Sequence, residues 1–316
     1  MAQRVSRSTF LATGSSLAIG LPLLTTRPAA AQAERPLHFA CSQVEGQAEG
    51  YYANELGLFK KAGFAADFQA MRGGSATVSA VVGGAIDVGC TNPISLGQAL
   101  QRGIKLTILT NGAVWNTKAP SGFAIVAPNS PVKTVKDLNG GIIGIPSLGG
   151  LNQMVMSAFI QNNGGDLASV KFVELPESAT LEALNTGRIA ASYLDDPQFS
   201  SFGDKIRSIG AASDAVAGKR AFAETVWFTS DDWLAQNKDV ARKVVDMIFA
   251  GGRWATANPE AAATFLARQF QLAPAKEHVT FDFTSNPAAV QLAFDAAVKY
   301  NFFKALKASD YYWNGK

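Results

Sequence analysis

The chain has 316 residues, of which 47% are hydrophobic and 17% charged, with 28 basic and 25 acidic side chains. This length exceeds one average domain, and the composition is that of a globular chain with sizeable cores, so we expect two domains. The sequence has no basic run and no patch that mixes basic with aromatic residues, which argues against a nucleic-acid partner.

The first 33 residues have the order of a secretory signal peptide. "MAQRVSRSTF" carries two arginines and no acid, and "LATGSSLAIGLPLL" is apolar but too short and too rich in Gly and Ser to span a bilayer. "AAAQA" then offers a small-x-small cleavage site that ends at Ala33. We therefore expect an exported protein, cleaved after Ala33, with an uncleaved membrane anchor as the alternative.

The route of export stays open between the general and the twin-arginine pathways. "SRSTFLA" resembles a twin-arginine signal, but Ser8 stands where the second arginine belongs. Cleavage after Ala33 would remove three of the 28 basic residues and none of the 25 acidic ones. The mature chain is then close to neutral.

The elements that follow alternate between strand and helix. "LHFACS" (37–42) predicts a short buried strand, and 50–63 a helix that ends at a glycine. A strand over 65–71, a helix over 75–84 and a strand over 86–92 complete the first unit. This β-α-β-α-β order is typical of a parallel sheet with right-handed crossovers.

The same order returns in the second half of the chain. Strands are predicted over 142–147, 169–175 and 189–196, and helices over 151–165 and 178–187. Six residues of "SATVSAVVGGAIDVG" at residues 75–89 recur at equivalent positions of "SATLEALNTGRIAAS", 103 positions later. The chain thus contains two copies of one α/β unit, each continuing into a further strand, "KLTILT" or "KIRSIG".

Two such units facing each other would form a cleft. In open parallel sheets, ligands bind outside the carboxyl ends of the strands, where helix N-termini offer unpaired N–H groups. The residues that follow the predicted strands are therefore the candidate binding residues. Most of them are small or polar.

Catalytic and metal motifs do not emerge from the sequence. Its two histidines, His38 and His278, and its two cysteines, Cys41 and Cys90, lack the short spacing of a zinc site, and neither histidine is placed for a catalytic triad. "GIPSLGG" is not a nucleophile elbow, and "GGSATVSAVVGG" is not a dinucleotide-binding loop. We expect no enzyme activity, no cofactor and no metal.

Three stretches carry a resemblance to a known family. They are "ANELGLFKKAGF…MRGGSATVSAVVGGAIDVG", "FAIVAPNSPVKTVKDLNGGIIGIPSLGG" and "LEALNTGRIAASYLDDP". Together they resemble the extracytoplasmic solute-binding proteins of ABC importers, in the group that handles nitrate, sulfonates, taurine and thiamine-precursor pyrimidines. The resemblance covers most of residues 36–250.

This resemblance implies a type II periplasmic-binding fold, an α/β architecture of two lobes that close around a ligand. Lobe 1 would comprise 36–121 and 223–316, and lobe 2 would comprise 122–222. Three amphipathic helices predicted over 238–256, 259–270 and 287–303 suit packing around lobe 1.

The implied function is that of a monomeric periplasmic protein. It would capture a small polar organic solute and deliver it to a membrane permease driven by a separate ATPase. Two alternatives stay open: a pyrimidine-synthase-like enzyme of the same fold, and a receptor that docks to a membrane sensor.

The candidate ligand-binding residues are Gln43, Gly74, Ser75, Thr91, Asn92, Trp115, Ser147, Gly149, Gly150, Asp195 and Asp196. Glycine-rich turns at 73–75 and 147–150 could bind an anionic or polar group through backbone N–H groups. Trp115 could stack on a planar ligand. Asp195 and Asp196 favour a ligand with an amine or an N-heterocycle, and Asp196, which precedes a proline as the family's acid does, is the better candidate of the two.

Cys41 and Cys90 end strands that the family's sheet makes neighbours. An exported protein can form disulfides. However, Cβ atoms on adjacent strands lie about 4.8 Å apart, whereas a disulfide prefers about 3.8 Å. We therefore expect two reduced, buried thiols.

Overall fold

The computed structural model describes residues 34–118, 120, 122–218, 220–275 and 278–315. Residues 34–316 form one unit in terms of their internal contacts. The predicted signal peptide, residues 1–33, lies outside the described residues. None of the described helices is both long enough and apolar enough to cross a membrane.

The first sheet has five strands: β1 (Arg35–Cys41), β2 (Phe64–Ala70), β3 (Val88–Thr91), β4 (Leu106–Asn111) and β11 (Val226–Ser230). Their order is β2-β1-β3-β11-β4. Strand β1 pairs in parallel with β2 and β3, as the β-α-β pattern predicts. Strand β11, which the sequence reading did not identify, is antiparallel to β3 and to β4.

The second sheet repeats this arrangement with β6 (Gly122–Val126), β7 (Ile142–Ile145), β8 (Lys171–Glu174), β9 (Ala191–Asp195) and β10 (Arg207–Ala211). Read from β8, its order is β8-β7-β9-β6-β10. Strand β7 is parallel to β8 and β9, whereas β6 is antiparallel to β9 and β10. In both sheets the antiparallel strand occupies the fourth position, so each sheet is mixed.

The internal repeat corresponds to equivalent elements. Helix α3 (Gly74–Val82) and helix α6 (Glu177–Asn185) begin and end 103 residues apart. Strands β3 and β9 also begin 103 residues apart. The duplicated sequence therefore encodes the same helix–strand pair in each sheet.

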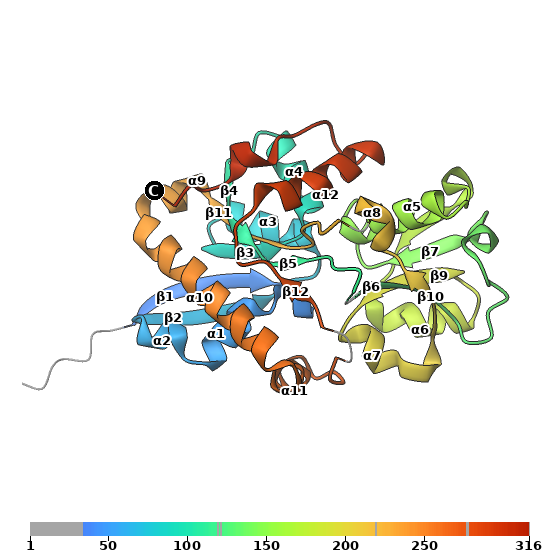
Figure 1. Ribbon diagram of the computed structural model, residues 1–316, viewed down its shortest axis with the longest axis horizontal. Helices are drawn as coiled ribbons and strands as arrows, with labels where there is room; N and C mark the ends of the chain where they lie inside the picture. Colours follow the sequence, from blue (N-terminus) through green and yellow to red (C-terminus); the bar gives the residue numbers. More distant parts are fainter. Residues whose placement is uncertain (1–33, 119, 121, 219, 276–277, 316) are drawn as a thin grey trace, which may run out of the picture. The chain divides into compact units, whose positions relative to one another are not determined.

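Helices cover both faces of the first sheet (Figure 1). Helices α1 (Glu49–Glu55), α2 (Leu58–Lys61) and α10 (Lys238–Ala257) lie on one face. Helices α3, α4 (Pro93–Gln101) and α12 (Pro287–Lys299) lie on the other. The single helix predicted over 50–63 is wrong in one respect: Gly57, at φ 68°, interrupts it and separates α1 from α2.

The second sheet is also covered on both faces, by α5 (Leu151–Asn162) and α8 (Asp214–Ala217) on one and by α6 and α7 (Gln198–Phe202) on the other. The remaining regular elements are α9 (Asp231–Gln236), α11 (Pro259–Phe270), β5 (Ala113–Val114), β12 (Thr280–Phe281) and the 3₁₀ turns Glu45–Gln47, Val135–Leu138, Leu167–Ser169, Gly203–Lys205 and Ala308–Tyr311.

Two connecting segments join the sheets, one between β4 and β6 and the other between β10 and β11, and they pair with each other. The N–H of Gly112 donates to the carbonyl of Thr225 at 2.9 Å, and the N–H of Trp115 donates to the carbonyl of Phe222 at 2.8 Å. Val114 and Ala223 form an antiparallel bridge between them. The first segment leads into β6 and the second into β11.

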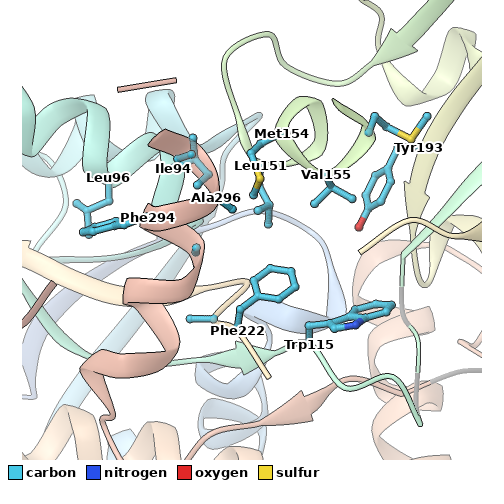
Figure 2. Close-up of a cluster of buried hydrophobic side chains, with 14 of the residues drawn as sticks. Ile94, Leu96, Trp115, Leu151, Met154, Val155, Tyr193, Phe222, Phe294 and Ala296 are labelled. Atoms are coloured by element: carbon cyan, nitrogen blue, oxygen red, sulfur yellow. The ribbon is translucent and has the colours of Figure 1, made fainter. Parts of the chain in front are cut away.

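A continuous apolar core accompanies these segments. Figure 2 shows Trp115 beside Phe222, with Tyr193 of β9 nearby. Leu151, Met154 and Val155 of α5 belong to the same buried cluster as Phe294 of α12. The cluster therefore contains residues from the helices of both sheets.

Cys41 and Cys90 lie on neighbouring strands, as the resemblance implied, since β1 pairs with β3. Both are free thiols and both are fully buried, on the face of the first sheet that packs against α1 and α10. Burial in apolar surroundings raises the pKa of each thiol well above its usual range.

We expect thiol titration to count two free thiols per chain, and only after unfolding. Buried, protonated thiols are poor nucleophiles, so an aromatic disulfide reagent should react slowly with the native protein and rapidly in denaturant without reductant. A count of zero in denaturant would show a disulfide instead.

A second prediction concerns the close packing of α10 on α1. A Cβ at Gly251 would lie 2.1 Å from the backbone oxygen of Glu49 and 2.8 Å from the backbone nitrogen of Ala53, so the helices would have to separate. We expect Gly251→Ala to lower the free energy of unfolding by about 2–3 kcal/mol. Urea unfolding followed by circular dichroism measures this loss.

Gly252→Ala is the matched control in the same helix. The atom nearest to its added Cβ, at 2.9 Å, belongs to the Phe283 ring, which can rotate away. Gly252→Ala should therefore lower the free energy of unfolding by clearly less than Gly251→Ala does. Equal losses in the two variants would contradict the packing argument.

Candidate functional site

A cavity of about 520 Å³ is lined by residues that follow strands of both sheets. Its lining residues are Ser42, Gln43, Val44, Gly46, Gln47, Ala70, Met71, Arg72, Gly73, Gly74, Asn92, Ser95, Pro146, Ser147, Gly150, Leu151, Asn152, Pro176, Glu177, Ser178, Asp195, Asp196, Gln198, Glu224, Thr225 and Val279. The carboxyl ends of parallel strands meet at one edge of a sheet, so the turns after β1, β2 and β3 converge there, as do those after β7, β8 and β9.

Seven of the eleven candidate residues line this cavity: Gln43, Gly74, Asn92, Ser147, Gly150, Asp195 and Asp196. The first three follow strands of the first sheet, and the other four follow strands of the second. Whether each of them contacts a solute stays a prediction.

The other four candidates do not line the cavity. Ser75 is exposed to solvent in the first turn of α3, and Gly149 lies at φ 75°, where its carbonyl accepts a hydrogen bond from Gln98 Nε2 at 2.8 Å. Thr91 is buried behind Gly74, since a Cβ at Gly74 would lie 2.4 Å from its hydroxyl oxygen.

Trp115 is the fourth of these candidates, and its predicted role of stacking on a planar ligand is wrong. Its side chain is 1% exposed within the apolar core, and its indole N–H donates to Asp214 at 3.0 Å. A ring packed on both faces has no surface on which a solute could stack. Trp115 therefore supports the segments between the sheets, and we leave it out of the proposed site.

Helix N-termini border the cavity from both sheets. Gly73 is the N-cap residue of α3 and Gly150 that of α5, and neither supplies a side-chain cap. Helix α4 differs, because Asn92 accepts a hydrogen bond from the N–H of Ser95 at 2.9 Å. The uncapped N–H groups of α3 and α5 give this part of the cavity a partial positive charge.

Acidic side chains dominate the charged part of the lining. Glu177, Asp195, Asp196 and Glu224 contribute carboxyl groups, and Arg72 is the basic residue among the described lining. Glu177 is the first residue of α6 and Asp195 is the last of β9. The lining thus combines acidic side chains with uncapped helix N-termini.

The environment of Asp195 favours its protonated form. Burial raises the pKa of this carboxyl group from its ordinary value to about 7, and the neighbouring charges of Glu177 and Asp196 act in the same direction. A hydrogen bond from the Tyr193 hydroxyl, at 2.8 Å, opposes the rise. Burial also raises the pKa of Glu177, against a hydrogen bond from Gln198 and the charge of Arg72.

The two adjacent acids differ in their surroundings. Asp196 is 1% exposed, and its Oδ1 accepts a hydrogen bond from the N–H of Ser200 at 2.8 Å, at the start of α7. Asp195 is only partly buried. The structure therefore gives Asp195 the more accessible carboxyl group, whereas the sequence favoured Asp196.

Sequence reasoning missed several lining residues. Glu177 stands 103 residues after Gly74, so the repeat itself could have identified it. Gln198 follows Pro197 by one residue and is 8% exposed. Its Nε2 donates to the carbonyl of Gln43 at 3.1 Å, and its Oε1 has no hydrogen-bond partner among the described residues. Glu224 precedes β11, and no pattern in the sequence had pointed to that strand.

A family model described as "NMT1/THI5 like" matches residues 47–262. The chain belongs to the NMT1/THI5-like family. The matched range includes the strand ends, helix starts and acidic residues described above, except Ser42 to Gly46 and Val279. No curated protein sequence matches the chain.

Solved structures similar to this chain include three binding proteins. The alkanesulfonate-binding protein SsuA from Xanthomonas axonopodis pv. citri, bound to MOPS, is 16% identical with a TM-score of 0.72, over 89% of this chain and 99% of that one. A ligand-binding component of an ABC-type import system from Staphylococcus aureus is 13% identical with a TM-score of 0.75, over 89% and 97%. The periplasmic nitrate-binding protein NrtA from Synechocystis PCC 6803 is 11% identical with a TM-score of 0.69, over 88% and 86%.

At sequence identities this low, the structural similarity establishes the fold alone. The fold is that of the type II periplasmic binding proteins, as the sequence predicted. The predicted resemblance is confirmed as membership of the NMT1/THI5-like family. Within the described ranges, no group of three or more His, Cys, Asp or Glu side chains is arranged to hold a metal ion.

The raised pKa of Asp195 predicts how stability depends on pH. An aspartate in the unfolded chain ionises near pH 4, whereas Asp195 in the folded protein ionises at about 7. The folded state therefore binds more protons between these values, and the contribution of Asp195, complete below about pH 4, is lost as the pH rises to about 7.

We expect Asp195→Asn to gain stability relative to the wild type across this same interval. The difference in the free energy of unfolding between the two proteins should grow from about pH 4 to about pH 7 and then stay constant, because asparagine does not ionise. Chemical unfolding at a series of pH values measures both proteins. Parallel curves would show that Asp195 ionises normally in the folded state.

Proposed function

We propose that this protein is the periplasmic substrate-binding component of an ABC importer. It captures a small polar organic solute in the cavity and delivers it to a membrane permease that a separate ATPase powers. The observation that carries this proposal is the cavity itself, whose lining comes from strand ends of both sheets. Its volume of about 520 Å³ suits a small organic molecule.

The cavity lies between two lobes in this proposal, lobe 1 being 36–121 with 223–316 and lobe 2 being 122–222. The two paired connecting segments would serve as the hinge. Polar contacts that join the two sides near the cavity include Gln98 to Gly149, Gln198 to Gln43, and the N–H of Glu45 to the carbonyl of Asp196 at 3.5 Å. A solute that contacts both lobes at once would favour the closed form, because only that form provides all its contacts.

The charges of the cavity support a solute with N–H donors. The carboxyl groups of Glu177 and Asp195 and the unpartnered Oε1 of Gln198 are acceptors. A protonated amine or an N-heterocycle would satisfy them. The uncapped N-termini of α3 and α5 would accept an oxygen-bearing or anionic group at the other end of the same solute.

The position of the reactive side chains supports a non-enzymatic role. His38 lies on β1, 3.6 Å from Asp67, and His278 lies 3.2 Å from Glu45, and neither lines the cavity. Both cysteines are buried in the first sheet. The alternative of a pyrimidine-synthase-like enzyme would need a reactive group within reach of the solute, and the alternative of a sensor-docking receptor would need a sensor partner.

We expect one solute per chain, bound without turnover by a monomer. Native mass spectrometry of the purified protein identifies a retained molecule. Thermal unfolding in the presence of amines, amino acids, sulfonates, nitrate and pyrimidines identifies further solutes that bind. A solute at about 100 times its Kd should stabilise the folded protein by about 2.7 kcal/mol, because only the folded cavity binds it.

Isothermal calorimetry then gives the stoichiometry, and product analysis after long incubation tests for chemistry. Steady formation of a product from any solute that binds would overturn the transport proposal in favour of the enzyme.

A further inference from the structure

The turn between β7 and α5 separates two hollows of the molecule. Ser147 and Gly150 line the main cavity, whereas Gly149 lines a second hollow of about 420 Å³. Leu148, in the same turn, is 46% exposed. A turn with a hollow on either side and an exposed leucine gains little from side-chain packing, so hydrogen bonds decide its conformation.

Two glutamines from different helices hold Gly149. Gln98 Nε2, on α4, donates to the Gly149 carbonyl at 2.8 Å. The Gly149 N–H donates to Gln153 Oε1, on α5, at 2.7 Å. A carbonyl only accepts and an N–H only donates, so Gln98 has to present its nitrogen and Gln153 its oxygen. The two side chains are chemically identical, but one acts as a donor and the other as an acceptor.

The Gln98 hydrogen bond also sets the direction of the next N–H along the chain. In a planar trans peptide, the C=O of one residue and the N–H of the following residue point in opposite directions. With the Gly149 carbonyl directed at Gln98, the Gly150 N–H is directed away from Gln98, and Gly150 lines the main cavity. Among the described residues, none accepts a hydrogen bond from this N–H.

The backbone alone does not impose this direction. The peptide joins two glycines, Gly149 at φ 75° and Gly150 at φ −98°. Rotation of the peptide plane alters ψ of the first residue and φ of the second, and glycine adopts either sign of φ. Without a donor at position 98, the same peptide could turn its carbonyl toward the cavity and offer an acceptor in place of a donor.

We propose that Gln98 is a positioning residue for the solute cavity. It holds the Gly149–Gly150 peptide with its N–H facing the cavity, and it thereby selects an oxygen-bearing acceptor group of the solute at the start of α5. The inference rests on the proposed solute-binding function and deepens it by naming the side chain that fixes this donor. Gln98 lines the second hollow and is not among the residues of the main cavity, so its effect on the solute passes through the peptide.

The hydrogen bonds on either side of this peptide leave its direction to Gln98. The Leu148 N–H donates to Glu174 Oε2 at 3.1 Å, one peptide before the N–H that Gln153 holds. The Gly150 carbonyl accepts from the Met154 N–H at 3.2 Å, in the first turn of α5. The neighbouring peptides are thus held by other groups. Among the described residues, Gln98 is the hydrogen-bond partner of the peptide between them.

The same substitution at both glutamines tests the proposal. Glutamate keeps the size of glutamine and accepts hydrogen bonds but, when ionised, cannot donate one. Gln98→Glu therefore loses the bond to the Gly149 carbonyl, whereas Gln153→Glu keeps an acceptor for the Gly149 N–H. Each variant adds one negative charge beside the same hollow, so Gln153→Glu is the matched control for charge.

Crystal structures of the ligand-free mature variants show the peptide directly. We expect the Gly149 carbonyl to keep its wild-type direction in Gln153→Glu and to turn away from residue 98 in Gln98→Glu. Gln98→Lys should restore the wild-type direction, because an ammonium group donates as the amide does. Gln98→Met has neither a donor nor a charge. It should behave like Gln98→Glu, and it takes the place of that variant if Gln98→Glu does not fold.

A titration in solution measures the consequence for binding. Sodium acetate is the acceptor probe, with sodium chloride to keep the ionic strength constant, and the ¹⁵N–¹H signal of Gly150 in glycine-labelled protein reports the contact. We expect acetate to move this signal in the wild type. Its affinity should be roughly tenfold weaker in Gln98→Glu, which lacks the hydrogen bond from the Gly150 N–H, and unchanged in Gln153→Glu.

Three results would overturn the proposal: a Gly149 carbonyl that keeps its direction in Gln98→Glu, equal losses of acetate affinity in the two glutamate variants, or a Gly150 signal that acetate does not move in the wild type. Failure of the transport function gives a different outcome. A protein that binds no organic solute, yet turns this peptide in Gln98→Glu and not in Gln153→Glu, refutes the function alone. A solute bound equally well by both variants refutes the role of Gln98 alone.

Discussion

The pairing of the two connecting segments is the constraint on which the rest of this structure depends. Each segment carries the chain from one sheet into the other, where its next strand, β6 or β11, enters as the antiparallel member. Hydrogen bonds from Gly112 to Thr225 and from Trp115 to Phe222 keep the segments side by side. The first sheet is completed by β11, which follows the second crossing, so the residues before the first crossing do not form that sheet alone.

The apolar core extends along these connecting segments. Trp115 and Phe222, one from each segment, lie in the same buried cluster as residues of α5 and α12. A cluster that spans both sides removes much apolar surface from water, which stabilises the fold by roughly 25 cal/mol per Å² buried. The connection between the sheets is thus a packed part of the core as well as a covalent link.

The cavity combines two kinds of charge for two different physical reasons. Its partial positive charge is a property of the backbone, because α3 and α5 begin there without side-chain caps. Its negative charge comes from side chains, Glu177 and Asp195 among them, whose ionisation burial opposes. Such a lining suits a solute with groups of both kinds.

The sequence by itself determined the repeated α/β unit, its helices and parallel strands, and the turns from which most of the candidate binding residues come. It could do so because these features depend on local patterns: hydrophobic periodicity, glycine stops and the position of residues at strand ends. Seven of the eleven candidate residues line the cavity for this reason. Only the tertiary structure decided the rest. Strands β6 and β11 take their places through pairing with distant segments, Trp115 is packed in the same buried cluster as Phe222, and Asp195 and Glu224 line one cavity. Those outcomes depend on contacts between residues far apart in the chain, and no local pattern in the sequence encodes them.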